Sequence, residues 1–163
     1  MNRKANTLFL RTVGGIGNRM YPLLMSLDGI KRSGHALALN WPVYDRGNAS
    51  HAMRESNFPL EVSELYNVSF PTITEGEWRA VNHEGLPAYG LKHTQLGVSG
   101  IREGNRPVPF LDHSDTSFVV EAHGWLDVDG EGWQIVQRIS EVYDEHLKLY
   151  DEQQDLLNGV LAQ

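Results

Sequence analysis

The sequence contains no cysteine, and its apolar runs are short. A chain without cysteine has no disulfide framework, no thiolate metal site and no cysteine nucleophile, and it fits a reducing compartment. No apolar window approaches the roughly 18 residues that a membrane-spanning helix requires. The first apolar run, Leu8 to Leu10, is interrupted by Arg11 and is too short for a signal-peptide core. We therefore expect a cytoplasmic protein without a membrane span.

Positive charge is also scarce, because 14 Lys and Arg residues stand against 21 Asp and Glu residues, which gives a net charge of −7. Nucleic acids and anionic membranes are bound mainly by clustered Lys and Arg side chains. This balance argues against a general nucleic-acid-binding surface. Any phosphate site must therefore be local.

Metal-binding and hydrolase motifs are missing as well. The seven histidines show no spacing such as H-E-x-x-H, and the nearest pattern, His113-x-Asp115, is typical of a polar turn. The stretch Asp127-x-Asp129-Gly130 matches only part of a calcium loop, because no Glu stands at the twelfth position. Neither a Ser-His-Asp pattern nor a nucleophile elbow is present. We expect no metal centre.

What the chain does have is the size and composition of one globular domain, with 163 residues of which 40% are hydrophobic. Three segments differ in texture: a strand-helix-strand (βαβ) unit over residues 7–42, a loop-rich segment over residues 43–117, and a strand plus helices over residues 118–163. Alternating strands and helices predict a single α/β domain over residues 1–163. Its three layers should contain a mostly parallel sheet.

The first segment predicts a strand near residues 7–13, a helix, and a second strand near residues 35–41. Apolar residues recur at helical spacing between the two strands. We expect Asn18 to be the N-cap of this helix, Pro22 to lie in its first turn, and Gly34 to end it.

The other two segments are less regular. The loop-rich segment predicts short elements, with a helical turn around "PLEVSELY". The last segment predicts a third strand near residues 117–122, followed by a helical stripe from Ile135 to Tyr143 with Lys148 near its end. A final helix is expected to begin at Asp151.

The turn between the first strand and the helix reads "GGIGNR". Its glycines, Gly14, Gly15 and Gly17, let the backbone approach a ligand closely, and a helix N-terminus favours a phosphate. Asn18 and Arg19 add hydrogen-bonding groups and a positive charge. Glycines at such a corner equally permit close helix packing and nothing else, so the turn by itself leaves both interpretations open.

The sequence does not match either of two common nucleotide-binding motifs. The dinucleotide fingerprint G-x-G-x-x-G needs a third glycine or alanine where the chain has Met20, and an acidic residue where it has Asn40. A phosphate loop needs Lys-Ser or Lys-Thr, and the sequence contains neither pair.

The residues from Gly14 to Trp41 do match the pattern of a third kind of segment. This span resembles the N-terminal segment of the fucosyltransferase superfamily, which includes bacterial α-1,2-fucosyltransferases, nodulation-type α-1,6-fucosyltransferases and protein O-fucosyltransferases. That segment runs from a strand through a glycine turn and a helix to a second strand that ends near a tryptophan. The matching residues, in order, are Gly14, Gly15, Gly17, Asn18, Lys31, Arg32, Gly34, Leu37, Leu39 and Trp41.

The resemblance implies a Rossmann-like domain of a GT-B-type glycosyltransferase. It also implies inverting, metal-independent transfer of fucose from GDP-fucose to a glycan acceptor, with Asn18 near the donor. In the family, a later strand carries H-x-R-R, whose arginine binds the donor diphosphate, and this motif is absent from the sequence. We therefore expect the N-terminal half of such an enzyme, inactive until a longer chain or a second polypeptide completes it. A non-catalytic sugar- or nucleotide-binding module is the alternative, and whether the chain is an enzyme stays open.

Three residues join the turn as candidates because ligands gather at the carboxyl ends of parallel strands. Asn40 ends the second strand, and His123 and Trp125 flank Gly124 after the third. His123 is suited to bond a sugar hydroxyl and Trp125 to stack on a sugar ring, although a core or capping role is the alternative. No catalytic residue is assigned, and no cofactor is expected beside the sugar nucleotide. The candidate substrate-binding residues are Gly14, Gly15, Gly17, Asn18, Arg19, Asn40, His123 and Trp125.

Overall fold

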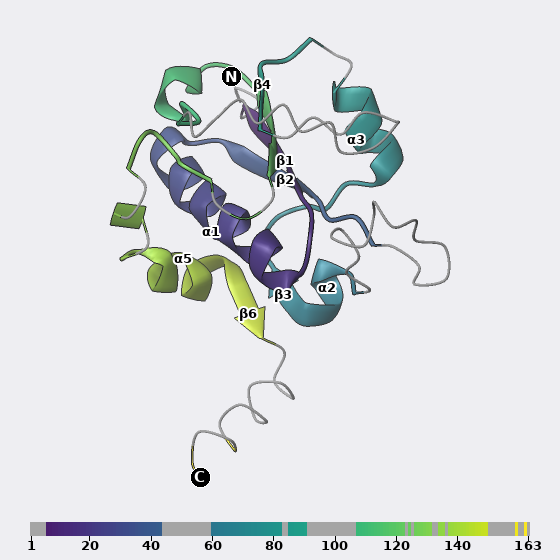
Figure 1. The fold of residues 1–163 in the computed structure, drawn as a ribbon, viewed down its shortest axis with the longest axis vertical. Helices are drawn as coiled ribbons and strands as arrows, with labels where there is room; N and C mark the ends of the chain where they lie inside the picture. Colours follow the sequence, from purple (N-terminus) through teal and green to yellow (C-terminus); the bar gives the residue numbers. More distant parts are fainter. Residues whose placement is uncertain are drawn as a thin grey trace, which may run out of the picture.

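A four-stranded parallel sheet forms the centre of the molecule (Figure 1). The computed structural model describes residues 6–43, 60–82, 85–90, 107–122, 124, 126–131, 134–135, 137–149, 159 and 162. The four strands, in their order across the sheet, are β2 (Ala36–Asn40), β1 (Thr7–Thr12), β5 (Phe118–Ala122) and β4 (Ala88–Gly90). Every neighbouring pair is parallel, so the chain has an α/β fold and the predicted parallel pairing of the first two strands is confirmed.

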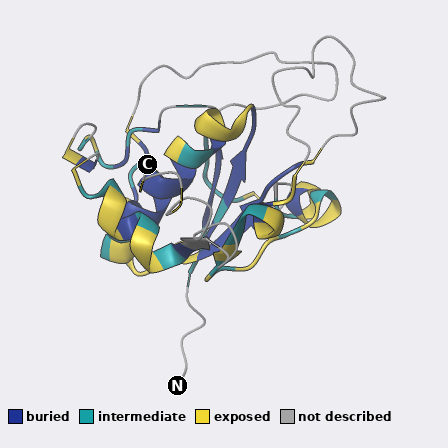
Figure 2. Cartoon of the chain, turned by 90° about the horizontal axis from the view of Figure 1, so that it is seen from below, coloured by how far each residue is buried: buried dark blue, intermediate teal, exposed yellow. Residues whose placement is uncertain are grey.

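Helices cover both faces of this sheet. The helix α1 (Ile16–Ser33) joins β1 to β2 and lies on one face with α5 (Ile139–His146) beside it, whereas α3 (Glu75–Asn82) lies on the other face (Figure 1). The strands and the inner side of α1 are the buried part of the molecule (Figure 2). The core between sheet and helix consists of apolar side chains, among them Leu8, Leu10, Leu23, Leu27, Leu37, Leu39, Phe118 and Val120.

The start of α1 differs from the prediction. The helix begins at Ile16, with Gly15 as its N-cap, so the prediction that Asn18 is the N-cap was wrong. Gly14 has a φ of +98°, a conformation that glycine adopts without strain, and this turns the chain into the helix earlier than the residue types indicate. Pro22 consequently lies in the second turn and not in the first.

The end of α1 follows the prediction. Gly34 caps the helix in the left-handed conformation, with a φ of +77°, and its N–H donates to the Ile30 carbonyl at 2.8 Å. This left-handed capping residue is the feature that glycine provides at helix ends. The strand β2 then begins two residues later at Ala36.

The loop-rich segment contributes short elements to both sides of the sheet. The predicted helical turn is confirmed as α2 (Val62–Leu65), and β3 (Tyr66–Val68), α3, β4 and a 3-10 turn, η2 (Leu111–His113), follow it. The outer edge of β2 is covered, because the Leu39 N–H donates to Pro71 and the Leu39 carbonyl accepts from Ile73. The sequence did not predict β3, α3 or β4.

The last described segment is only partly as expected. The stripe from Ile135 to Tyr143 is not one helix, because a turn at residues 137–138 precedes α5. Lys148 lies two residues past the end of α5, near a helix end as expected, in a short strand, β6 (Leu147–Leu149), which pairs antiparallel with β3. The helix expected from Asp151 onward lies outside the described residues, except for residues 159 and 162. None of the described helices has the length and apolarity needed to cross a membrane.

Candidate functional site

The turn after β1 lies at the carboxyl edge of the parallel sheet, beside the end of β5. From β1 the chain crosses through α1 to β2 on one side, while β5 pairs with β1 on the other side. In open parallel sheets, ligands bind outside the carboxyl ends of the strands. The residues that follow these two strands meet there. We call Gly14, Gly15, Gly17, Asn18 and Gly124 the glycine-turn site.

The glycines of α1 and its turn serve different purposes. Gly14 is required by its positive φ. Gly29 is required by packing, because an added Cβ would lie 2.6 Å from Phe110 and 2.9 Å from Val128. An added Cβ at Gly15 or Gly17 would meet nothing within 4 Å, and neither residue has a positive φ. Neither a positive φ nor packing against the described residues therefore explains Gly17, whereas Gly15 is the N-cap of α1, a position that glycine favours.

The N-terminus of α1 presents backbone N–H groups at this turn. The N-cap Gly15 makes no side-chain capping bond, and the first turn contains no acidic residue. The first N–H groups of a helix have no partner within the helix, and the helix dipole places partial positive charge on them. An anion is the ligand that this arrangement favours.

Asn18 joins the turn after β1 to the residue after β5. Its backbone carbonyl accepts a hydrogen bond from the Gly124 N–H at 2.8 Å. Its side-chain Oδ1 lies 3.6 Å from the position that a Cβ on Gly124 would occupy. Gly124 has a φ of +79°, which a side chain would strain. The structure thus brings Asn18 and Gly124 together, a contact that the sequence analysis missed.

Arg19 supports the turn from inside the protein. It is 0% exposed, its Nε–H donates to the Gly14 carbonyl at 2.6 Å, and its Nη1 donates to the Pro42 carbonyl at 2.7 Å. Its guanidinium carbon lies 5.0 Å from the ring centroid of Trp41. These contacts connect the segments that follow β1 and β2. Arg19 therefore lies beneath the turn and holds its backbone.

Thr12 adds a polar group directly before the turn. It is the last residue of β1, is 0% exposed and shares a sheet face with Leu10, the face that α1 covers. Its hydroxyl has no hydrogen-bond partner within the described part of the chain. A buried hydroxyl without a partner is uncommon in folded proteins. It leaves hydrogen-bonding capacity beside the glycine-turn site.

Asn40 lies on the opposite face of the sheet from Thr12. It is paired in register with Arg11, and Arg11 with Glu121, so the three side chains form one polar row under α3. Asn40 is 2% exposed and donates from Nδ2 to the Ile73 carbonyl at 3.2 Å, while its Oδ1 has no partner among the described residues. The structure therefore does not bring Asn40 to the α1 side, where the turn lies.

Charged side chains join α3 to this polar row. The Arg11 Nη1 donates to both oxygens of Glu75 at 2.8 Å, and Arg11 Nε lies 3.7 Å from Glu121 Oε1. The Arg11 guanidinium also lies 5.9 Å from the centroid of the Trp78 ring. The Arg11–Glu121 pair is buried on both sides, whereas the Glu75 side chain is 42% exposed. These contacts hold α3 against the carboxyl half of the sheet.

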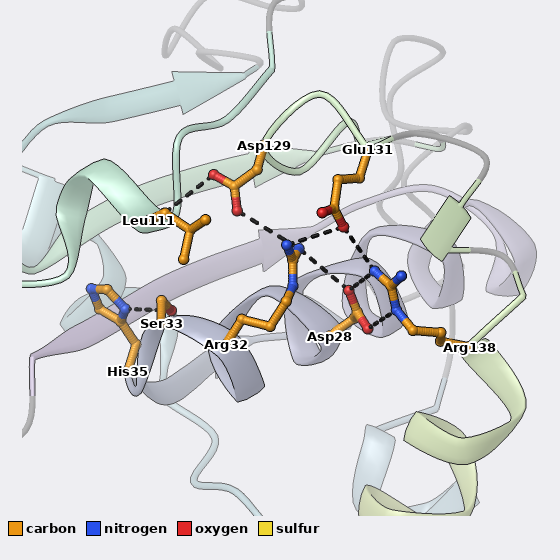
Figure 3. Close-up of polar contacts among 8 residues, drawn as sticks. All are labelled: Asp28, Arg32, Ser33, His35, Leu111, Asp129, Glu131 and Arg138. Atoms are coloured by element: carbon orange, nitrogen blue, oxygen red, sulfur yellow. Dashed lines mark hydrogen bonds and ion pairs between the residues drawn. The ribbon is translucent and has the colours of Figure 1, made fainter.

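A second charged cluster lies at the carboxyl half of α1 (Figure 3). Asp28 is 3% exposed and receives two 3.0 Å hydrogen bonds from Arg138, which also donates to Glu131 at 2.8 Å. Hydrogen bonding to Asp28, and then to Glu131, raises the pKa of Arg138. Arg32 lies 3.0 Å from Glu131. This cluster fastens the segments around Glu131 and Arg138 to α1 and lies away from the glycine turn.

His123 and Trp125 lie outside the described residues, so the structure does not place them. Within the described part of the chain, no group of three or more His, Cys, Asp or Glu side chains is arranged to hold a metal ion. The candidate site that the structure does assemble is the glycine-turn site, with Arg19 and Thr12 beside it.

Comparisons with protein-family models, with curated proteins and with solved structures find no match to this chain. The resemblance to the fucosyltransferases therefore rests on the residues between Gly14 and Trp41 themselves.

Proposed function

We propose that this chain carries the glycine-turn part of a fucosyltransferase-like glycosyltransferase, and that the glycine-turn site binds the GDP-fucose donor. The Rossmann-like, GT-B-type assignment of the α/β fold belongs to the same proposal. The observation that carries it is that Gly17 has no positive φ and that a Cβ there would meet none of the described residues within 4 Å. Glycine in a helix costs about 1 kcal/mol relative to alanine, and at the carboxyl edge of a parallel sheet a glycine leaves room for the close approach of a ligand.

The chemistry of the site suits one end of a sugar nucleotide. The N–H groups at the start of α1 favour the negative charge of a phosphate, and the Asn18 amide can bond a phosphate oxygen or a hydroxyl without adding charge. The turn lies where β1 and β5 end side by side, the location at which open α/β sheets bind nucleotides. The glycan acceptor would approach the same edge of the sheet.

Transfer needs more than these residues supply. In an inverting reaction, an acceptor oxygen forms a bond to the sugar carbon while the bond to the diphosphate breaks, and positioned donors must stabilise the departing charge. Losing one such donor typically costs on the order of a hundredfold in rate. The family's arginine-bearing motif is absent from this sequence. We therefore propose that a further polypeptide segment or a second chain completes the enzyme.

Donor binding by these residues alone should be weak. Two or three hydrogen bonds contribute about 1 kcal/mol each, or about 1.5 kcal/mol and somewhat more when one partner is charged, as a phosphate is, whereas a micromolar complex needs roughly 8 kcal/mol. We expect a dissociation constant for GDP-fucose on the order of millimolar.

Substitution of Gly17 by alanine tests the proposal. Gly17→Ala should stabilise the fold by about 0.5–1 kcal/mol, because alanine favours helix, and should weaken GDP-fucose binding at least about fivefold. Gly76→Ala is the matched control, because Gly76 is also the second residue of a helix and lies in α3. It should stabilise the fold without changing affinity. Unchanged affinity in Gly17→Ala and in Asn18→Ala would place the binding site elsewhere.

Separate titrations with GDP, with fucose and with GDP-fucose distinguish the enzyme from a non-catalytic binding module. A donor site gains affinity from both parts of the sugar nucleotide, so GDP-fucose should bind more tightly than either part. Equal affinity for GDP-fucose and for free fucose would favour a sugar-binding module that does not use the diphosphate.

A further inference from the structure

A proline stands inside α1 at the position that controls the Asn18 carbonyl. In a regular helix, the carbonyl of Asn18 would accept the N–H of the residue four positions later, and that residue is Pro22, which has no N–H. The carbonyl instead accepts the N–H of Gly124 at 2.8 Å. Gly124 is the second residue after β5, and it lies more than 100 residues further along the chain than Asn18.

We propose that Pro22 is a positioning residue: it directs the Asn18 carbonyl away from the helix ladder and toward Gly124, and so fixes the end of β5 against the glycine turn. The docking of Gly124 follows from the hydrogen bond alone. Its consequence for donor binding rests on the proposed function.

The position of Pro22 is unfavourable for the helix itself. A proline in a helix interior removes one hydrogen bond, and its ring crowds the carbonyl four residues earlier. Pro22 is buried and α1 continues past it to Ser33, so this proline does not end the helix. Its effect is local, at the one carbonyl that Gly124 uses.

The Gly124 side of the contact is equally specific. Its φ of +79° aims its N–H at the Asn18 carbonyl, and the Asn18 Oδ1 lies 3.6 Å from the place of a Cβ. Asn18 thus bonds Gly124 through its backbone carbonyl, and its side chain would touch any Cβ added to Gly124. When Gly124 is held in this position, it also limits the space beside the glycine turn in which a ligand could bind.

The Pro22→Ala variant separates positioning from simple stabilisation. Alanine restores an N–H that competes with Gly124 for the Asn18 carbonyl, and it also favours the helix. If Pro22 has only a structural role, the substitution should change the stability of the fold and the affinity for GDP-fucose in the same direction. Positioning predicts weaker ligand binding without a loss of stability. Tyr21→Ala is the control, because it raises helix propensity at the neighbouring, half-exposed position without adding an N–H.

Three measurements on the purified chain complete the test: the melting temperature, the hydrogen-exchange rate of the Gly124 amide by NMR, and the affinity for GDP-fucose. In Pro22→Ala we expect an unchanged or higher melting temperature, about five- to tenfold faster exchange at Gly124, and about fivefold weaker GDP-fucose binding. Tyr21→Ala should leave the Gly124 exchange rate and the affinity unchanged. Gly124→Ala, which strains the same contact from the other side, should weaken GDP-fucose binding to a similar degree.

An unchanged Gly124 exchange rate in Pro22→Ala would overturn the positioning role. A faster exchange rate together with unchanged affinity would overturn its link to the ligand. If the unsubstituted chain does not bind GDP-fucose at all, the proposed function fails, and the exchange rate still decides whether Pro22 docks Gly124.

Discussion

The Nε–H of Arg19 donates to the carbonyl of Gly14 at 2.6 Å, from a side chain that is 0% exposed. A basic residue in a glycine turn is commonly taken as a ligand contact. Here the guanidinium lies below the turn, and it also binds the Pro42 carbonyl at 2.7 Å. The backbone geometry of the turn depends on a buried side chain.

Replacing Arg19 by methionine should therefore destabilise the protein. The carbonyls of Gly14 and Pro42 would lose their guanidinium donors, and unsatisfied buried acceptors are costly. We expect the free energy of unfolding, measured with urea, to fall by about 2–4 kcal/mol. Arg79→Met is the control, because the Arg79 side chain is 70% exposed, and it should cause no measurable change. Equal effects of the two substitutions would contradict the account.

Asp28 should be the most sensitive member of the cluster in Figure 3. Asp28→Asn removes the charge that accepts two hydrogen bonds from Arg138. Because the Arg138 side chain is 39% exposed, water partly replaces the lost contact, and we expect a loss of about 1–3 kcal/mol in urea unfolding. Lys31→Gln, which removes an exposed ion pair with Glu145, should have little effect. A larger loss in Lys31→Gln than in Asp28→Asn would refute this ranking.

The N-terminus of α3 should respond to acid through Glu77. Hydrogen bonds from the Thr74 N–H, at 2.6 Å, and then from the Thr74 hydroxyl, at 2.9 Å, lower the pKa of Glu77 below its ordinary value of 4.5. A lowered pKa in the folded state means that the stabilisation is complete above pH 4.5 and is lost as pH falls through the folded pKa.

Glu77→Gln provides the comparison for this pH dependence. At pH 7 the variant should unfold at a lower urea concentration than the unsubstituted chain, because glutamine lacks the charge that these bonds favour. The difference should narrow below pH 4.5, as the pH falls through the lowered pKa of Glu77 in the folded state. A difference that stays constant over this range would show that the charge of Glu77 does not contribute.

The regular parts of the fold were predictable from the sequence because their signals are local. The apolar runs of β1, β2 and β5 and the helical spacing of α1 all carry their own pattern. The strands β4 and β6 have only three residues each, and pairing with β5 and β3 makes them strands. A pattern that short cannot be separated from a loop without its partner.

The start of α1 shows how residue preference misleads. Asn is a better N-cap residue type than Gly, so the sequence favoured Asn18 over Gly15. The φ of Gly14 decided otherwise, by turning the chain into the helix three residues earlier. The position of Pro22, four residues after Asn18, was the available signal, because it marks a carbonyl that no helix N–H can reach.

The site was predictable only where it is continuous in sequence. The turn from Gly14 to Asn18 could be recognised, but the burial of Arg19 depends on Pro42 and Trp41, and the contact to Gly124 depends on the pairing of β1 with β5. Asn40 is the last residue of β2, as predicted, yet the alternation of side chains along the strand places it on the α3 face.

Titration of the 15N-labelled chain with GDP-fucose, followed amide by amide, tests the central claim most directly. The glycine-turn site predicts saturable chemical-shift changes that are largest at the N–H groups of Gly14, Gly15, Gly17 and Gly124 and that are reduced in Asn18→Ala. No change at these amides at millimolar GDP-fucose, or changes confined to the row of Arg11, Asn40 and Glu121 on the other face of the sheet, would contradict it.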